Sequence, residues 1–162
     1  MKQLRLEPID GNDFKVCIED EYIGSANSPK WYSWGTRDIT TADGVVYNLR
    51  PSAFLGFEFE LRFDDKLLYE IRSGNLGNVI VFRKNSTIAY AMKREQNFVK
   101  SNLVLVDGDG STQLIIQSKF NWREFETKYT ISISEGFGNS DLEKAIVVLA
   151  MMFYDSLHDN ND

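Results

Sequence analysis

The sequence is poor in the residue types on which many kinds of site depend. Among its 162 residues there is one cysteine, Cys17, and one histidine, His158. A single cysteine excludes an internal disulfide and a cysteine metal cluster, and a single histidine excludes a His-cluster zinc site. A Ser-His-Asp triad would depend on His158, in a polar tail of the kind that frays. No GxxxxGK[ST] or GxGxxG string is present, so no phosphate-binding loop of either type is predicted.

Long apolar segments are also lacking. The ten apolar residues Ala145 to Tyr154 are bounded by Lys144 and Asp155, whereas a transmembrane helix needs about 20. We therefore expect no transmembrane segment. The opening MKQLRLEPID has no apolar core, so we expect no signal peptide and a cytoplasmic location, where Cys17 stays reduced. We interpret Cys17 as a small core residue on an alternating strand.

Positive charge is in short supply. The net charge is −6, and a broad nucleic-acid footprint needs a basic face, so no nucleic-acid partner is expected. The same charge disfavours constitutive binding to an anionic membrane. Arg83-Lys84 and Lys93-Arg94 lie on the two arms of a predicted hairpin, roughly 17 Å apart along the strands. We interpret them as solvated charges that do not form one headgroup pocket.

Alternating apolar and polar residues dominate the rest of the chain, a pattern typical of half-buried strands. Aromatic residues make up 13% of the sequence, which also favours strands. The clearest example is Leu55–Phe63, in which every odd-numbered residue is apolar. In Glu124–Ser134, residues 125, 127, 129, 131 and 133 share the predicted inner face. The other predicted strands are Met1–Glu7, Phe14–Ile18, Tyr22–Gly24, Lys30–Ile39, Val45–Leu49, Leu67–Ile71, Val79–Arg83, Thr87–Met92, Asn97–Val106 and Thr112–Ser118.

One helix is predicted at residues 140–159. Ser140 and Glu143 have the spacing of a capping box, which marks the start of a helix. The run Ala145 to Tyr154 has no polar face, so this helix must be enclosed. About eleven or twelve strands can form a barrel wide enough to hold a helix. We therefore predict one domain over residues 1–162, a closed antiparallel barrel of about twelve strands around a hydrophobic C-terminal helix.

The order of these elements resembles the tubby C-terminal-like superfamily, which includes tubby proteins, phospholipid scramblases and LURP-one-related proteins. KYTISI at 128–133, a short break, DLEKAIVVLA at 141–150 and the hairpin FRKNSTIAYAMK at 82–93 carry the resemblance. It implies a twelve-stranded barrel around a hydrophobic C-terminal helix. Tubby domains bind phosphoinositide headgroups through basic residues, but this chain shows no matching motif, and no family site residue carries over.

The candidate reactive groups favour structural interpretations. VDGDGS at 106–111 lacks the Gly and Glu that an EF-hand loop needs at its sixth and twelfth positions, so it predicts a hairpin turn. Glu58 and Glu60 lie about 7 Å apart on one strand face. A catalytic glycosidase pair could use this spacing. Two exposed carboxylates on the solvent-facing side of an amphipathic strand explain it equally well. We predict no catalytic residue, no metal site and no cofactor.

Two aromatic clusters stand out: Trp31, Tyr32 and Trp34, and the corner Phe120-Asn121-Trp122. Consecutive aromatic residues cannot all face inward on a strand. These residues therefore either form an exposed partner-binding patch or belong to the core with ordinary partial exposure. We predict a non-enzymatic, cytoplasmic binding or interaction module whose partner is an unknown protein or a lipid headgroup. The alternative is a lipocalin-like or fatty-acid-binding-like carrier of a small apolar ligand, with the helix packed outside the barrel.

Overall fold

The computed structural model describes residues 1–9, 13–27, 36–52, 58–74, 79–96 and 101–158, without the side chains of 96 and 156–158. The predicted cluster of Trp31, Tyr32 and Trp34 lies outside these residues. The described strands are β1 Lys2–Pro8, β2 Asp13–Ile18, β3 Glu21–Asn27, β4 Arg37–Thr41, β5 Val46–Pro51, β6 Glu58–Phe63, β7 Lys66–Ser73, β8 Val79–Lys84, β9 Thr87–Gln96, β10 Ser101–Asp107, β11 Thr112–Asn121 and β12 Glu126–Ile133. They are followed by one helix, α1 Asp141–His158.

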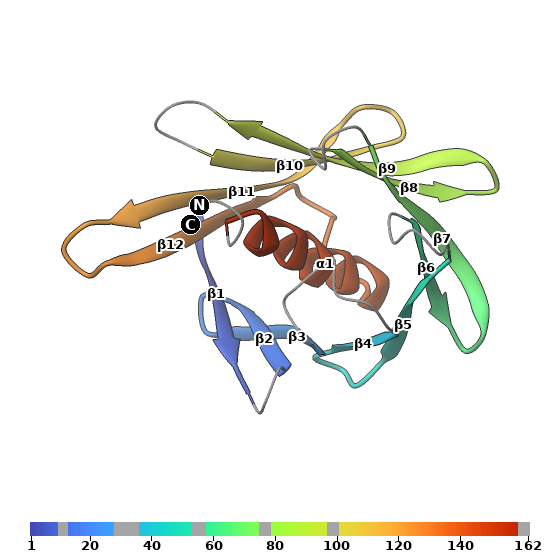
Figure 1. Ribbon diagram of the computed structural model, residues 1–162, viewed down its shortest axis with the longest axis horizontal. Coiled ribbons are helices and arrows are strands. Elements are labelled where there is room, and N and C mark those ends of the chain that lie inside the picture. The colour runs from blue at the N-terminus through green and yellow to red at the C-terminus, as the bar shows by residue number, and fades with distance from the viewer. Residues whose placement is uncertain (10–12, 28–35, 53–57, 75–78, 97–100, 159–162) are drawn as a thin grey trace.

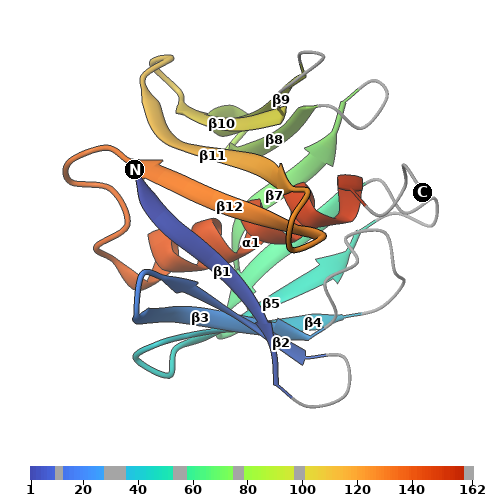
Figure 2. The ribbon, with the colours of Figure 1, turned by 90° about the vertical axis from the view of Figure 1, so that its left-hand side faces the viewer.

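The twelve strands form a closed barrel in which each strand pairs antiparallel with the next one in sequence. The barrel closes where β1 pairs with β12, through Lys2 opposite Ile131 and Leu4 opposite Tyr129. Figure 1 shows the strands surrounding α1, and Figure 2 shows β1 and β12 crossing in front of it. The predicted fold class, a twelve-stranded antiparallel barrel around the C-terminal helix, is confirmed.

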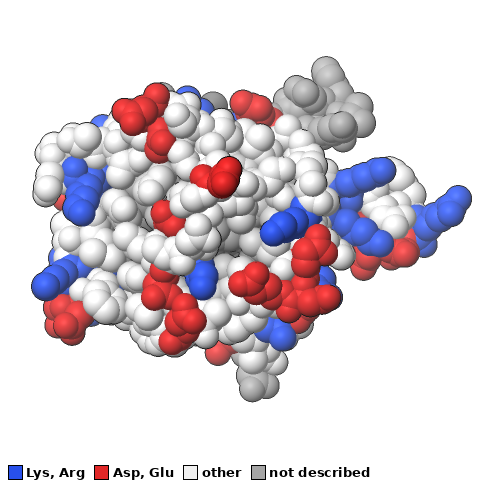
Figure 3. Space-filling model, turned by 180° about the vertical axis from the view of Figure 1, so that it is seen from behind, with Lys and Arg blue, Asp and Glu red and all other residues white. Residues whose placement is uncertain are grey.

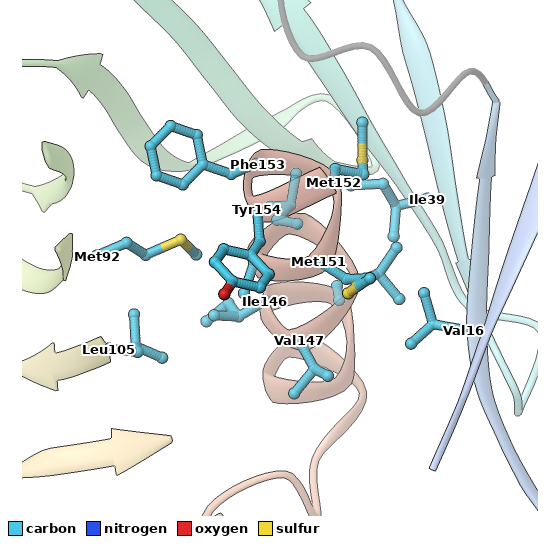
Figure 4. Close-up of a cluster of buried hydrophobic side chains, with 14 of the residues drawn as sticks. Val16, Ile39, Met92, Leu105, Ile146, Val147, Met151, Met152, Phe153 and Tyr154 are labelled. Atoms are coloured by element: carbon cyan, nitrogen blue, oxygen red, sulfur yellow. The ribbon is translucent and has the colours of Figure 1, made fainter. Parts of the chain in front are cut away.

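The helix fills the interior of the barrel. Every residue from Ala145 to Tyr154 is at most 3% exposed, so this helix is buried on all sides. In Figure 4, Met92 and Leu105 approach the helix from one wall and Val16 and Ile39 approach from the other. The inward residues of nearly all the strands and the helix form one hydrophobic cluster. The run Ala145 to Tyr154 therefore lacks a polar face because the helix is enclosed, as predicted.

A glycine lets the helix lie close to one wall. A Cβ added to Gly24 on β3 would lie 2.9 Å from the carbonyl oxygen of Thr40 and 3.0 Å from Cγ2 of Val148. Both distances are too short for an unshifted side chain, so the lack of a side chain at Gly24 permits this contact between the sheet and the helix.

The predicted capping box is present at the start of α1. The amide of Glu143 donates to Oγ of Ser140 at 3.2 Å, and Oε2 of Glu143 accepts from the amide of Ser140 at 3.1 Å. The same oxygen also accepts from the amides of Gly138 and Asn139, each at 3.0 Å. One carboxylate therefore fixes the helix start and the loop that enters it.

Two residues differ from their predicted places. Phe63 is 42% exposed and Phe125 is 79% exposed, although both were predicted on inner strand faces. Phe63 is the last residue of β6, beside the turn into β7, and Phe125 precedes β12 in a turn. Cys17 is buried, as predicted, but it is not part of the central cluster. It lies opposite Arg5 on the outer side of β2, and burial raises the pKa of its thiol.

Candidate interaction site: the projecting hairpin

The two predicted strand carboxylates are each held by an arginine. Oε1 of Glu58 lies 3.5 Å from Nε of Arg72, and Oε2 of Glu60 lies 2.7 Å from Nη2 of Arg62. They border a cleft of about 210 Å³ to which Glu70 and Ser52 also contribute. These pairings agree with the interpretation of Glu58 and Glu60 as surface charges.

The DGDGS segment forms the predicted hairpin turn between β10 and β11. Oδ1 of Asp107 accepts from the amides of Asp109 at 3.0 Å and Ser111 at 2.9 Å, and Oδ2 accepts from Nε2 of Gln113 at 2.7 Å. Both carboxylate oxygens therefore stabilise the turn. Among the described residues, no three His, Cys, Asp or Glu side chains are grouped to hold a metal ion.

The basic pairs on β8 and β9 are separated along the hairpin. Arg83 pairs with Ile88 next to the turn, whereas Lys93 pairs with Val79 at the other end of the ladder. The predicted separation along the hairpin is confirmed.

The ends of β11 and β12 extend beyond their neighbours in the barrel. Among the described residues, β1 pairs with β12 as far as Tyr129, and β10 pairs with β11 as far as Ser118. From there outward, within the described part of the chain, residues 119–128 pair only with each other. We call residues 119–128 the projecting hairpin; it reaches out at the left of Figure 1.

The base of the projecting hairpin is attached to the C-terminal part of the helix. The hydroxyl of Tyr154 lies 2.9 Å from Oγ of Ser118 and also bonds to the carbonyl of Ser101. The hydroxyl of Tyr129 donates to Oδ1 of Asp155 at 2.9 Å. The rings of Tyr129 and Tyr154 pack edge to face at 5.8 Å. The buried helix therefore supports the hairpin where it leaves the barrel.

The tip of the hairpin exposes large aromatic side chains. Trp122 is 77% exposed, Phe125 is 79% exposed and Phe120 is 41% exposed. The rings of Phe120 and Trp122 pack edge to face with their centroids 4.8 Å apart. A cleft of about 480 Å³ is lined by Phe120 and Trp122 together with Lys119, Asn121, Arg123 and Lys128.

The polar side chains of the tip bond to one another. Oδ1 of Asn121 accepts from the amide of Arg123 at 3.0 Å, and its Nδ2 donates to Oε2 of Glu124 at 3.0 Å. Nζ of Lys128 lies 2.5 Å from Glu124 and 3.4 Å from Glu126. The hydrogen bond from Lys128 lowers the pKa of Glu124, and the same bond raises the pKa of Lys128. These bonds order the turn while its aromatic rings stay exposed.

Phe125 has a backbone conformation that is rare for an aromatic residue. Its φ is 49°, in the left-handed region that favours glycine and asparagine. Phenylalanine at this position adds local strain and leaves an apolar ring in water. Neither feature stabilises the isolated barrel.

Comparison with known proteins returns no match to a family model, a curated protein or a solved structure. The resemblance to the tubby C-terminal-like superfamily therefore stays a prediction. In the described residues, no helix combines the length and the apolar character needed to cross a membrane.

The sequence identified one part of this site and missed another. The corner Phe120-Asn121-Trp122 stands out in the sequence because two aromatic residues flank Asn121. The alternation that runs through Tyr129 and Ile131 also includes Phe125, and it therefore predicts Phe125 on the same strand face. Asn121, a residue that favours turns, is the signal that the chain turns here and that the next strand starts later, at Glu126.

Proposed function

We propose that this protein is a non-enzymatic, cytoplasmic binding module that contacts its partner through the tip of the projecting hairpin. The observation that carries the proposal is the exposure of Trp122 and Phe125, each above three quarters, on a turn ordered by its own hydrogen bonds. Aromatic residues and arginine dominate the binding energy of protein interfaces, and Arg123 lies between the two rings in sequence.

The tip can supply useful binding energy at a small entropic cost. Burying a Phe or Trp side chain that was exposed contributes roughly 1.5–3 kcal/mol. The turn is already ordered by Asn121 and Glu124, so little backbone freedom is lost on binding. A rigid aromatic tip is therefore suited to act as an interface anchor.

The filled interior favours binding on the outer surface over the carrier function. A carrier of the lipocalin or fatty-acid-binding type needs space for its ligand inside the barrel. Here α1 lies inside, with Ala145 to Tyr154 at most 3% exposed. An apolar ligand would have to displace that helix, so we place the binding surface on the exterior.

Photocrosslinking tests this function. The photoreactive amino acid p-benzoylphenylalanine replaces Phe125 in one variant and Leu67 in a control, and both are irradiated in native cell extract. Leu67 is 43% exposed near the start of β7, far from the projecting hairpin in Figure 1. We expect a discrete adduct from position 125 only, reduced by excess unlabelled wild-type protein and unaffected by excess Trp122→Ala. The same adducts from both positions, or no adduct at 125, would overturn the proposal.

A further inference from the structure

We propose that the cleft beside Trp122 binds an acidic linear segment of a partner protein, one with a large apolar side chain next to its carboxylates. The inference rests on the proposed function and specifies the partner of the same hairpin. It follows from the shape of the cleft, the cations around it and the charge of the whole chain.

The cleft has an aromatic wall and the size of a side-chain site. The rings of Phe120 and Trp122 pack edge to face, and they line a cleft of about 480 Å³. Such a pair presents both a ring face and a ring edge to an apolar or aromatic group. One large side chain and the backbone on either side of it would cover these rings.

Three cationic side chains line the cleft and would attract a negatively charged group. Lys119 and Lys128 lie directly opposite each other on β11 and β12, an arrangement in which like charges repel. Glu124 and Glu126 bond to Lys128. Among the described residues, the side chains of Lys119 and Arg123 take part in no ion pair. A carboxylate of the bound segment would pair with these two groups and relieve the repulsion.

The overall charge favours a peptide over an anionic membrane. The projecting hairpin holds three cations (Lys119, Arg123 and Lys128) and two anions (Glu124 and Glu126), a net of +1; the chain carries −6, so the rest carries −7. Figure 3 shows several Lys and Arg side chains at the projecting end with acidic side chains beside them, and side chains of both charges over the rest of the same face. A net of +1 gives little attraction to an anionic bilayer. Contacts within the cleft, by contrast, act at short range.

Selection from a random peptide library tests the inference without a known partner. Phage-displayed peptides are selected on the wild-type protein, and synthetic versions of the enriched peptides are titrated by calorimetry. We expect sequences that combine Asp or Glu with Trp, Phe, Leu or Met. Lys119→Glu with Arg123→Glu should weaken their affinity about tenfold or more, as should Trp122→Ala. Lys84→Glu, an exposed charge reversal on the β8–β9 turn, should bind like wild type.

Each alternative result has a distinct meaning. Peptides that require Trp122 but carry no acidic residue would overturn the acidic partner and leave the proposed function standing. Peptides that bind Trp122→Ala as tightly as wild type would overturn both. If no peptide is enriched, and phosphatidylcholine–phosphatidylserine vesicles sediment the wild-type protein but not Trp122→Ala, the partner is a membrane and the inference is wrong.

Discussion

At the scale of single residues, one carboxylate organises the entrance to the barrel. Glu143 accepts hydrogen bonds from three consecutive amides, at Gly138, Asn139 and Ser140. The Ser140–Glu143 spacing predicted the last of these bonds. The other two depend on the loop before the helix, in which Gly136 and Gly138 have positive φ. Local spacing cannot specify that path.

Tyr69 provides a residue-scale prediction for alkaline pH. Burial, assisted by Tyr90 and Glu143, raises the pKa of Tyr69 from 10.0 to about 12. The unfolded chain loses this proton at lower pH than the folded protein, so the free energy of unfolding should fall as pH rises from 10 towards 12. The contribution of Tyr69 is roughly 2–3 kcal/mol. Denaturant titrations across this range measure it.

Two tyrosine variants separate the role of Tyr69 from general alkaline effects. Tyr69→Phe has no proton to lose and should show a shallower fall in stability. Tyr22→Phe, at a position 38% exposed, should follow the wild-type curve. Equal slopes for Tyr69→Phe and wild type would contradict the predicted role of Tyr69.

At the scale of elements, the strands were predictable and the projection was not. Alternation identified the core residues Phe59 and Leu61, because buried and partly exposed positions alternate strictly from Glu58 to Arg62. In the described part of the chain, the projecting hairpin begins where the pairing with β1 ends, at Tyr129, and where the pairing with β10 ends, at Ser118. The points at which β1 separates from β12 and β10 separates from β11 depend on the closed sheet as a whole. No local pattern in residues 119–128 predicts them.

Phe125 links the stability of the hairpin to its proposed function. Phe125→Gly should raise the free energy of unfolding by about 0.5–1 kcal/mol, because glycine adopts positive φ without strain. The same change should weaken binding at the tip, because the exposed ring is lost. Phe125→Ala is the matched control: it removes the ring and keeps the strain, so it should weaken binding without raising stability. Chemical denaturation and peptide titration measure the two effects, and tighter binding by Phe125→Gly would contradict this role.

At the scale of the whole molecule, a filled barrel directs binding outward. Ala145 to Tyr154 predicted an enclosed helix because no side of it is polar, and closure of twelve strands supplies the enclosure. The sequence predicted the helix inside the barrel, with a helix packed outside it as the alternative. The structure places it inside, in the space that a carrier would use for its ligand.

Native mass spectrometry of freshly purified protein tests this account most directly. The same sample in denaturing solvent gives the covalent mass for comparison. Because the helix fills the barrel, the native mass should equal that of the chain alone, without a small apolar adduct. A stoichiometric apolar molecule present in the native spectrum and lost on denaturation would show that the interior opens to a ligand. That result would contradict the filled barrel and favour the carrier.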